Sequence, residues 1–233
     1  MYCLVLTLSG SSQPVQKKVS NDSLFRIEKL LFQDDFASLD TNKWRIEKTA
    51  SDSEIVTTKN NRLLIDTYGG ATIFYTRELS GNVYISYKRT VLINKGKNDR
   101  LSDLNQFFMV REVKTDRLSK RNGGFAEYDS LNMYYVGMGG NYNTTTRFRK
   151  YENGNKKIIA EYTDAAHLLQ ANHEYLIEII FLNGTIIYKV DGNIFFEWKD
   201  NNPYTKGYFA IRSTRSRQEI NDLKIYSIQT RIQ

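Results

Sequence analysis

The chain has 233 residues, a formal net charge of +7 and 40% hydrophobic residues. This hydrophobic share is enough to build a core, which excludes a wholly disordered chain. The positive charge favours a polyanionic partner, such as nucleic acid, an anionic membrane or a uronic-acid polysaccharide, without choosing among them.

A few residue types limit the chemistry of any site. The single cysteine, Cys3, excludes an intrachain disulfide and a cysteine-based metal cluster. The two histidines, His167 and His173, are too few for a histidine-rich metal site. We therefore expect no cofactor, although a structural Ca²⁺ ion stays compatible with the sequence. No run of about 18 apolar residues is present, so no membrane-spanning helix is expected.

The chain starts with MYCLVLTLSGSS, a short apolar run followed by small residues. Such a run resembles the middle of an export signal, although the basic residues that normally precede it are missing. We expect residues 1–22 to be a remnant of an export segment or a disordered N-terminus. The first alternative implies a secreted or periplasmic protein, and with either alternative we expect one domain over residues 23–233.

From residue 25 onward, short apolar and alternating runs are separated by turn signals. The expected strands are 25–32, 62–68, 71–79, 82–93, 104–111, 131–137, 146–152, 156–162, 173–183, 185–192, 193–200, 207–213 and 220–229. The strongest hairpin signals are Asn183-Gly184 and Asp191-Gly192. A further hairpin is expected across Gly69-Gly70, and one or two helical turns at 164–171. The pattern predicts an all-β, two-sheet antiparallel jelly-roll sandwich.

Alternate residues of a strand point to opposite faces of a sheet. If Leu104, Leu131, Phe148 and Phe209 face the core, the opposite face of one sheet is rich in amide, hydroxyl and guanidinium groups. Its expected members are Asn105, Arg111, Asn132, Tyr134, Arg147, Arg149 and Arg212. Such groups hold sugars, and arginine pairs with the carboxylates of acidic sugars. The alternative is that these are ordinary solvent-facing strand positions.

Several stretches carry a resemblance to a known family. They are GGATIFYTRELSGNVYISYK, NDRLSDLNQFFM, YDSLNMYYVGMGGNYNTTTRFRKY and GYFAIRSTRSRQEINDLKIYSI. The chain resembles, over about residues 32–229, an uncharacterised Bacteroidetes family related to the YesU-like proteins, with the concanavalin A-like lectin/glucanase jelly roll. The resemblance implies an exported protein, often encoded beside enzymes that degrade pectic polysaccharides such as rhamnogalacturonan, and hence an acidic polysaccharide as its partner. It implies no catalytic mechanism.

The residue inventory first suggests a polysaccharide lyase. β-Elimination from a uronic acid needs a base, a neutralised carboxylate and a proton donor for the leaving oxygen. Tyr134 is the expected base beside Arg147 or Arg149, and Arg147 and Asn132 are expected to neutralise the sugar carboxylate. The residues expected to bind the substrate are Asn105, Phe107, Arg111, Glu127, Asp129, Arg149 and Arg212.

Two alternatives stay open. A glycoside hydrolase would use Glu127 and Asp129, which lie two residues apart and would share one strand face. However, Asn132 stands where the related E-x-D-x-x-E motif has its last carboxylate. A non-catalytic glycan-binding module explains the same residues without any reaction. Nucleic acid is the less favoured partner, because the basic residues are scattered and no recognition motif is present.

Overall fold

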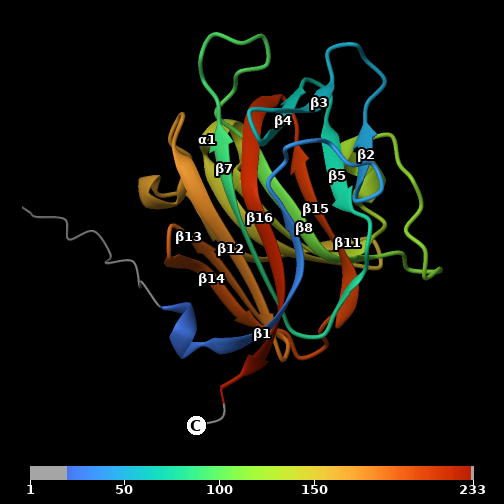
Figure 1. Cartoon of the computed structure of the whole chain (residues 1–233), viewed down its shortest axis with the longest axis vertical. Helices are drawn as coiled ribbons and strands as arrows, with labels where there is room; N and C mark the ends of the chain where they lie inside the picture. The colour runs from blue at the N-terminus through green and yellow to red at the C-terminus, as the bar shows by residue number, and fades with distance from the viewer. Residues whose placement is uncertain (1–19, 232–233) are drawn as a thin grey trace, which may run out of the picture.

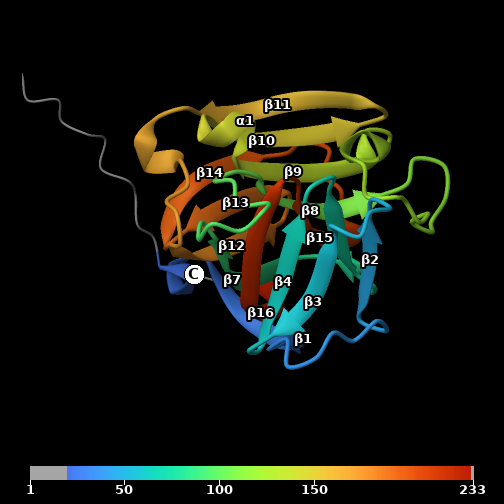
Figure 2. The ribbon, with the colours of Figure 1, turned by 90° about the horizontal axis from the view of Figure 1, so that it is seen from above.

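The computed structural model describes residues 20–231 and consists of two antiparallel eight-stranded sheets packed face to face (Figure 1, Figure 2). The first sheet has the order β14-β13-β12-β7-β16-β4-β3, with β1 paired to β16. The second has the order β11-β10-β9-β8-β15-β5-β2, with β6 paired to β15. The predicted all-β two-sheet jelly roll is confirmed.

The strands of the first sheet are β1 (Phe25–Asp34), β3 (Ile55–Lys59), β4 (Arg62–Thr67), β7 (Val83–Val91), β12 (Glu174–Leu182), β13 (Thr185–Val190), β14 (Asn193–Lys199) and β16 (Ser216–Thr230). Those of the second sheet are β2 (Trp44–Lys48), β5 (Ala71–Tyr75), β6 (Leu79–Ser80), β8 (Leu104–Arg111), β9 (Asn132–Gly139), β10 (Thr145–Glu152), β11 (Asn155–Tyr162) and β15 (Lys206–Ser213). The short helices are η1 (Asn21–Ser23), η2 (Phe125–Tyr128), α1 (Gly140–Asn143) and η3 (Ala165–His167).

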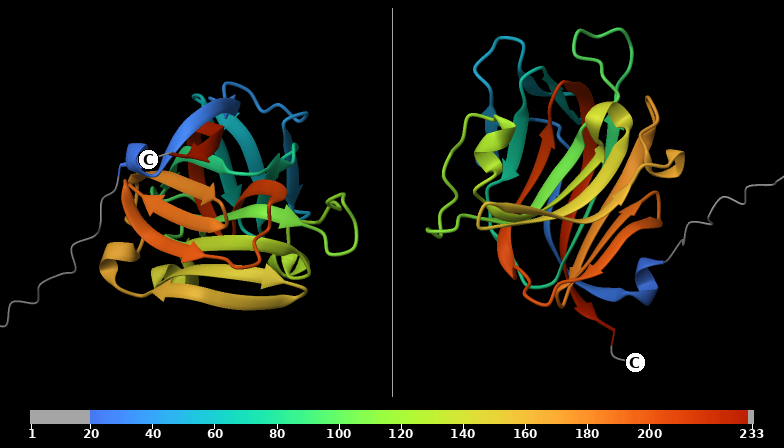
Figure 3. Two further views of the ribbon diagram at one scale, coloured as in Figure 1. Left: turned by 90° about the horizontal axis from the view of Figure 1, so that it is seen from below. Right: turned by 180° about the vertical axis from the view of Figure 1, so that it is seen from behind.

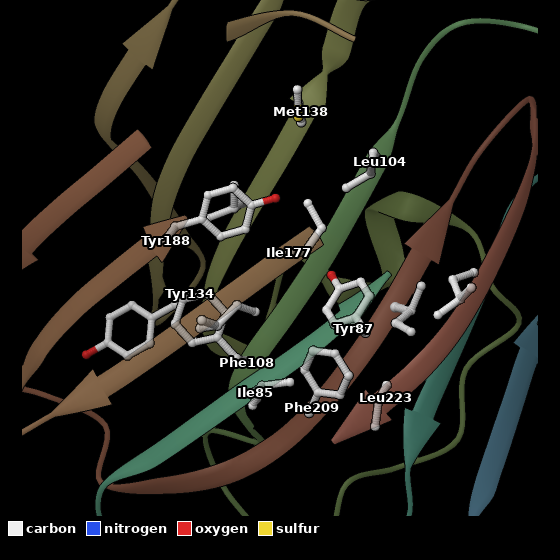
Figure 4. Close-up of a cluster of buried hydrophobic side chains, with 14 of the residues drawn as sticks. Ile85, Tyr87, Leu104, Phe108, Tyr134, Met138, Ile177, Tyr188, Phe209 and Leu223 are labelled. Atoms are coloured by element: carbon white, nitrogen blue, oxygen red, sulfur yellow. The ribbon is translucent and has the colours of Figure 1, made fainter. Parts of the chain in front are cut away.

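The main core lies between the sheets, because strands of both contribute one buried face to it. Figure 4 shows part of this cluster, with Ile85 and Tyr87 from β7 beside Phe108 from β8 and Phe209 from β15. Aromatic rings fill much of the space. This packing fixes which side chains of the second sheet remain for its other face.

The two hairpins with Asn-Gly and Asp-Gly turns are confirmed. β12 pairs with β13 and β13 with β14, and Asn183 and Asp191 both have positive φ, as such turns require. The hairpin expected across Gly69-Gly70 is wrong. β4 pairs with β3 and β16, whereas β5 pairs with β2 and β15. The chain crosses from one sheet to the other at these glycines.

Two further expectations need correction. The helical turns predicted at 164–171 shrink to η3, and strands β2 and β3 were not predicted. The expected boundary at residue 22 is also too late. Asn21 donates to Tyr84 Oη at 3.2 Å and accepts from Lys189 Nζ at 2.6 Å, so it already belongs to the fold. Residues 1–19 of the expected export segment lie outside the described residues.

The sequence predicted no membrane-spanning helix. Within residues 20–231, no helix is long and apolar enough to cross a bilayer.

Candidate functional site

The outer face of the second sheet, which points away from the first sheet, carries a second apolar cluster with polar groups at its edges. Its residues include Phe74, Asn105, Phe107, Met133, Tyr135, Arg149, Tyr151, Ala210 and Arg212. An exposed sheet face would be polar, so this apolar character indicates that another part of the chain covers it.

The cover is the segment between β8 and β9, residues 112–131, which we call the strap (the yellow-green loop on the right of Figure 1). Its η2 helix places the Tyr128 ring 5.5 Å from Phe107 and 6.2 Å from Phe74. The Tyr128 hydroxyl donates to Glu47 Oε2 at 2.8 Å. Burial raises the pKa of Glu47 despite the nearby Arg45. The middle of the outer face is therefore closed to a large ligand.

Arg212 fastens the strap from below. It is fully buried, and its guanidinium donates to the Gly123 carbonyl at 2.8 Å and to Thr72 Oγ1 at 2.7 Å. The same guanidinium lies 5.0 Å from the centre of the Phe125 ring and 5.1 Å from that of Tyr128. Burial lowers the pKa of Arg212. Its role in this structure is to hold the strap.

An open pocket remains beside the strap, where β8 and β10 begin and β9 ends. Its volume is about 110 Å³, and its lining residues are Asp103, Phe125, Tyr135, Gly137, Gly140, Asn141, Thr145, Arg147 and Arg149. The ring of Phe125 is 38% exposed at this place. The pocket thus combines an accessible ring, a phenol, a carboxylate and two guanidinium groups.

The glycine at position 137 keeps this pocket open. The Tyr135 hydroxyl donates to Asn105 Oδ1 at 3.1 Å directly over it. A Cβ at position 137 would lie 2.3 Å from that hydroxyl and 2.7 Å from Asn105 Oδ1. Any other residue at position 137 would displace the tyrosine or break its hydrogen bond.

The pocket is lined by two positively charged side chains, Arg147 and Arg149, and one carboxyl group, Asp103. Arg149 lies 5.1 Å from the centre of the Tyr135 ring, while Arg147 forms an ion pair with Glu161 of β11. Asp103 is half-buried and pairs with Arg100. Burial raises the pKa of Asp103, and the neighbouring cation only partly offsets this. Burial likewise raises the pKa of the Tyr135 phenol, with Arg149 opposing the rise.

A buried arginine supports the site from inside the sandwich. Arg89 of β7 is fully buried and donates to the carbonyls of Asn105 and Arg212, both at 2.8 Å, and to Gln218 Oε1 at 2.6 Å. Burial lowers the pKa of Arg89. These bonds tie β8 and β15 to the first sheet at the positions whose side chains reach the outer face.

The structure brings some of the predicted residues together and separates others. Arg147 and Arg149 line the pocket, and Asn105 hydrogen-bonds to its tyrosine. Phe107 and Arg212 lie under the strap. Arg111 of β8 lies opposite Asn132 of β9 in the strand register, at the end of these two strands that is away from the pocket. Asn132 there accepts from the backbone N–H of Asn153 at 2.7 Å.

The expected outward position of Tyr134 is wrong. Tyr134 is fully buried in the main core beside Phe108 and Phe148 (Figure 4). Its hydroxyl donates to Asp200 Oδ2 at 2.6 Å, and burial together with this bond raises its pKa. A core phenol cannot reach a substrate on the outer face, so Tyr134 is not the base.

The expected strand position of Glu127 and Asp129 is also wrong. Glu127 belongs to η2 and accepts from the backbone N–H of Asn122 at 2.8 Å, while Asp129 forms an ion pair with Lys156 at 2.7 Å. The Glu127 carboxylate makes a hydrogen bond within the strap, and the Asp129 carboxylate attaches the strap to β11. Neither lines the pocket, so the hydrolase arrangement built on this pair lacks its geometry.

Seven of the nine residues that line the pocket were not predicted as site residues, and Tyr135, Asp103 and Phe125 are the three with functional side chains that matter most here. Tyr135 is the neighbour of the residue chosen, Asp103 lies in the SDLN stretch, and Phe125 lies in the strap. Only Asp103 carried a signal in the sequence, as a carboxylate directly before an expected strand.

No metal centre is evident in residues 20–231, where no three histidine, cysteine, aspartate or glutamate side chains are grouped to hold an ion. The hollow of about 260 Å³ between β1 and β16 contains Asp34, Asp35 and Asp222. Asp34 there already accepts from Trp44 Nε1 at 2.8 Å and from the Phe36 N–H at 2.8 Å.

Comparison with known proteins supports the jelly roll. A family model described as Domain of unknown function (DUF6250) matches residues 65–223. No curated protein matches the chain.

Many solved structures resemble the fold, among them these three. A Bacillus subtilis protein of unknown function with a galectin-like fold has 15% identity and a TM-score of 0.72, covering 89% of this chain and 100% of that chain. The carbohydrate binding module CBM66 from Bacillus subtilis has 14% identity and a TM-score of 0.56, covering 79% and 96%. An endo-β-1,3-glucanase from Pyrococcus furiosus has 11% identity and a TM-score of 0.63, covering 94% and 100%. These identities show the fold alone, a concanavalin A-like jelly roll.

Proposed function

The chain belongs to the family described as Domain of unknown function (DUF6250), and from that premise we propose that it binds an acidic saccharide in the pocket beside the strap. The observation that carries the proposal is the pair Arg147 and Arg149 in one small pocket with the Phe125 ring. Guanidinium groups recognise a sugar carboxylate, and a partly exposed ring stacks on a sugar face. The neighbours named as a carbohydrate binding module and a glucanase agree with a saccharide ligand.

Binding without reaction is the function favoured by the state of Tyr135. The pocket does contain the tyrosine, amide and guanidinium that an elimination needs, in Tyr135, Asn105 and Arg149. β-Elimination would move the C5 proton to the Tyr135 phenolate, form the C4–C5 double bond and release the C4 oxygen, which takes up a proton. Because burial raises the pKa of Tyr135, little phenolate exists at neutral pH. A lyase with Tyr135 as its base is therefore the second candidate.

Two-carboxylate hydrolysis has less support. Asp103 is the only carboxylate among the residues lining the pocket within the described chain, and such hydrolysis needs two. We keep the finer expectations as proposals: a pectic ligand, export to the periplasm or medium, and kinship with the YesU-like Bacteroidetes proteins.

The proposal is tested by titrating galacturonate and glucuronate, with galactose and glucose as neutral counterparts, in a calorimeter. We expect Arg149→Ala to weaken uronate binding about tenfold or more, because a hydrogen bond to a charged group contributes roughly 1.5–3 kcal/mol. Arg77→Ala, which removes an exposed arginine that follows β5 and does not line the pocket, is the matched control. Equal losses for uronates and neutral sugars would refute carboxylate recognition. Ultraviolet absorbance of unsaturated products at alkaline pH would identify a lyase.

A further inference from the structure

Next to the pocket, two exposed tyrosine rings are each stacked on an arginine. They are Tyr68 with Arg215 and Tyr142 with Arg100, which together we call the tyrosine ridge. We propose that the ridge is a second sugar-binding subsite, so that the protein takes an anionic oligosaccharide rather than a single sugar. This inference rests on the proposed function.

The ridge borders a hollow of its own. The hollow has a volume of about 240 Å³ and is lined by Tyr68, Lys97, Asn98, Asp99, Arg100 and Arg215. Its one carboxylate, Asp99, is already paired with Arg217 at 2.7 Å. Lys97, Arg100 and Arg215 therefore leave the hollow with an excess of positive charge, which suits an anionic ligand.

Arg100 joins the ridge to the pocket. Its Nε donates to the Arg215 carbonyl at 2.9 Å, while its Nη2 contacts Asp103, which lines the pocket. The backbone that precedes Tyr142 also connects the ridge to the pocket, because Gly140 and Asn141 line the pocket. Pocket and ridge are thus neighbouring parts of one surface, with Asp103 and Arg100 between them.

The loop that presents Tyr142 has an unusual backbone. Asn141, Tyr142 and Asn143 have φ values of 51°, 61° and 62°, and a bulky side chain rarely adopts this left-handed conformation. The Asn143 amide holds the loop in place by accepting from the Leu169 N–H at 2.8 Å and donating to the Leu169 carbonyl at 2.9 Å.

The strain is not offset by burial, because the Tyr142 side chain is 68% exposed. Strained residues that present an exposed ring are common at ligand sites. Tyr68 is 53% exposed, and Arg215 holds it in place by lying over its ring and donating a hydrogen bond to its hydroxyl. A ring stacked on an arginine has one face against the cation and can offer the other to a sugar.

The choice of a saccharide over nucleic acid follows from continuity with the pocket. The pocket that adjoins the ridge offers two guanidinium groups and one partly exposed ring, Phe125, which suit a single sugar ring with a carboxylate. A uronate chain places a carboxylate and an apolar sugar face on each unit, which matches alternating arginine and aromatic groups.

The test measures how affinity depends on chain length. Galacturonate and oligogalacturonates of two to about six units are titrated into the full chain, and the same is done with glucuronate and its oligomers. We expect the wild-type affinity to rise at least tenfold from the monomer to the trimer. In the double variant Tyr68→Ala/Tyr142→Ala, this gain should vanish while the monomer affinity stays within twofold of wild type.

Two variants separate this inference from the proposed function. Arg149→Ala should lower the affinity for every length, whereas Leu30→Ala, which removes an exposed side chain from the other sheet, should change none. A wild-type affinity independent of chain length overturns the ridge and leaves the pocket intact. If no uronate of any length binds, both proposals fail. Tight binding of a single-stranded oligonucleotide that the double variant abolishes would make the ridge a nucleic-acid surface and overturn the inference.

Discussion

Single positions decide which side chains form the site, and Tyr134 and Tyr135 are the clearest example. They are adjacent, yet one lies in the main core and the other lines the pocket. The alternation rule expected the opposite assignment. In β9 both faces are apolar, with Tyr134, Val136 and Met138 on one and Met133 and Tyr135 on the other, so the pattern could not tell core from site.

The core position of Tyr134 predicts a purely structural effect of mutation. Tyr134→Phe removes the hydrogen bond to Asp200 and leaves the Tyr204 N–H without its acceptor. We expect the free energy of unfolding in urea to fall by about 1.5–3 kcal/mol, the usual contribution of a bond to a charged group. Uronate affinity should stay within about twofold of wild type. Lost affinity with unchanged stability would return Tyr134 to the site.

The pocket carboxylate predicts a pH dependence of binding. Burial raises the pKa of Asp103, against the opposing effects of Arg100, Ser102, Asn105 and Arg212, so its carboxyl takes up a proton more readily in the folded protein than in the unfolded chain. An anion bound beside it favours the neutral form further. Uronate affinity should therefore rise as pH falls from about 8 to about 5, where a sugar carboxylate is still ionised.

The variant Asp103→Asn should bind uronate more tightly at neutral pH and lose this dependence. Stability follows the same sign. Because the folded pKa lies above the unfolded one, the folded state holds more protons between the two values, and the free energy of unfolding falls as pH rises through that interval. Titrations of both proteins across the pH range check the point, and a slope retained by Asp103→Asn would assign it to another group.

Among the elements, β8 shows why register is harder to predict than the existence of a strand. The bounds 104–111 were predicted, but Met109 has a φ of 52° and forms a bulge opposite Gly207 of β15. A Cβ at position 207 would lie 2.3 Å from the Met109 carbonyl carbon, so the glycine permits this close approach. The bulge turns Met109 into the main core and Val110 to the outer face, the reverse of strict alternation.

The strap is the element whose function was invisible in the sequence. The sequence analysis expected Glu127 and Asp129 on a strand face, and nothing local indicated that Leu118, Tyr128 and Leu131 would cover a sheet face. Such contacts join residues far apart in the chain, as Tyr128 and Glu47 show. The closed middle of the outer face therefore had to come from the structure.

The Tyr128 hydroxyl predicts how firmly the strap is held. Tyr128→Phe removes its bond to the buried Glu47, worth about 1.5–3 kcal/mol, and should raise the population of the open strap about tenfold or more. Tryptic cleavage after the exposed Lys114, Arg117 and Lys120 should accelerate by that factor. Tyr226→Phe, in the other sheet, serves as the control, and equal cleavage of both variants would show that the strap is held by its apolar contacts alone.

At the scale of the whole molecule, composition and periodicity were sufficient for the fold class. Thirteen short runs bounded by turn signals led to two antiparallel sheets, and the sheets are found. The distribution of strands between sheets was not accessible in the same way. β4 and β5 are separated by only a few residues but lie in different sheets, because their partners β16 and β15 come from the end of the chain.

The net charge likewise predicted a general property of the molecule but not its location in the structure. A value of +7 suggested an anionic partner but gave no location. Several of the arginines prove to be structural: Arg89 and Arg212 are buried, and Arg217 is paired with Asp99. The other cations are spread over the surface, and a group of them that includes Arg149 and Arg215 lies in the pocket and the tyrosine ridge.

One strand, β16, runs from the end of the molecule with the pocket and the tyrosine ridge to the opposite end. β16 starts at Ser216, whose hydroxyl donates to the Arg100 carbonyl at 3.1 Å, and reaches Thr230, which pairs with Phe25 at the start of β1 (Figure 3). Fifteen residues of extended chain span roughly 45–50 Å. Phe25 and Thr230 therefore lie together at the end of the molecule away from the pocket and the tyrosine ridge. Two copies joined in tandem could each engage the same polymer, and their avidity would depend on the tether alone.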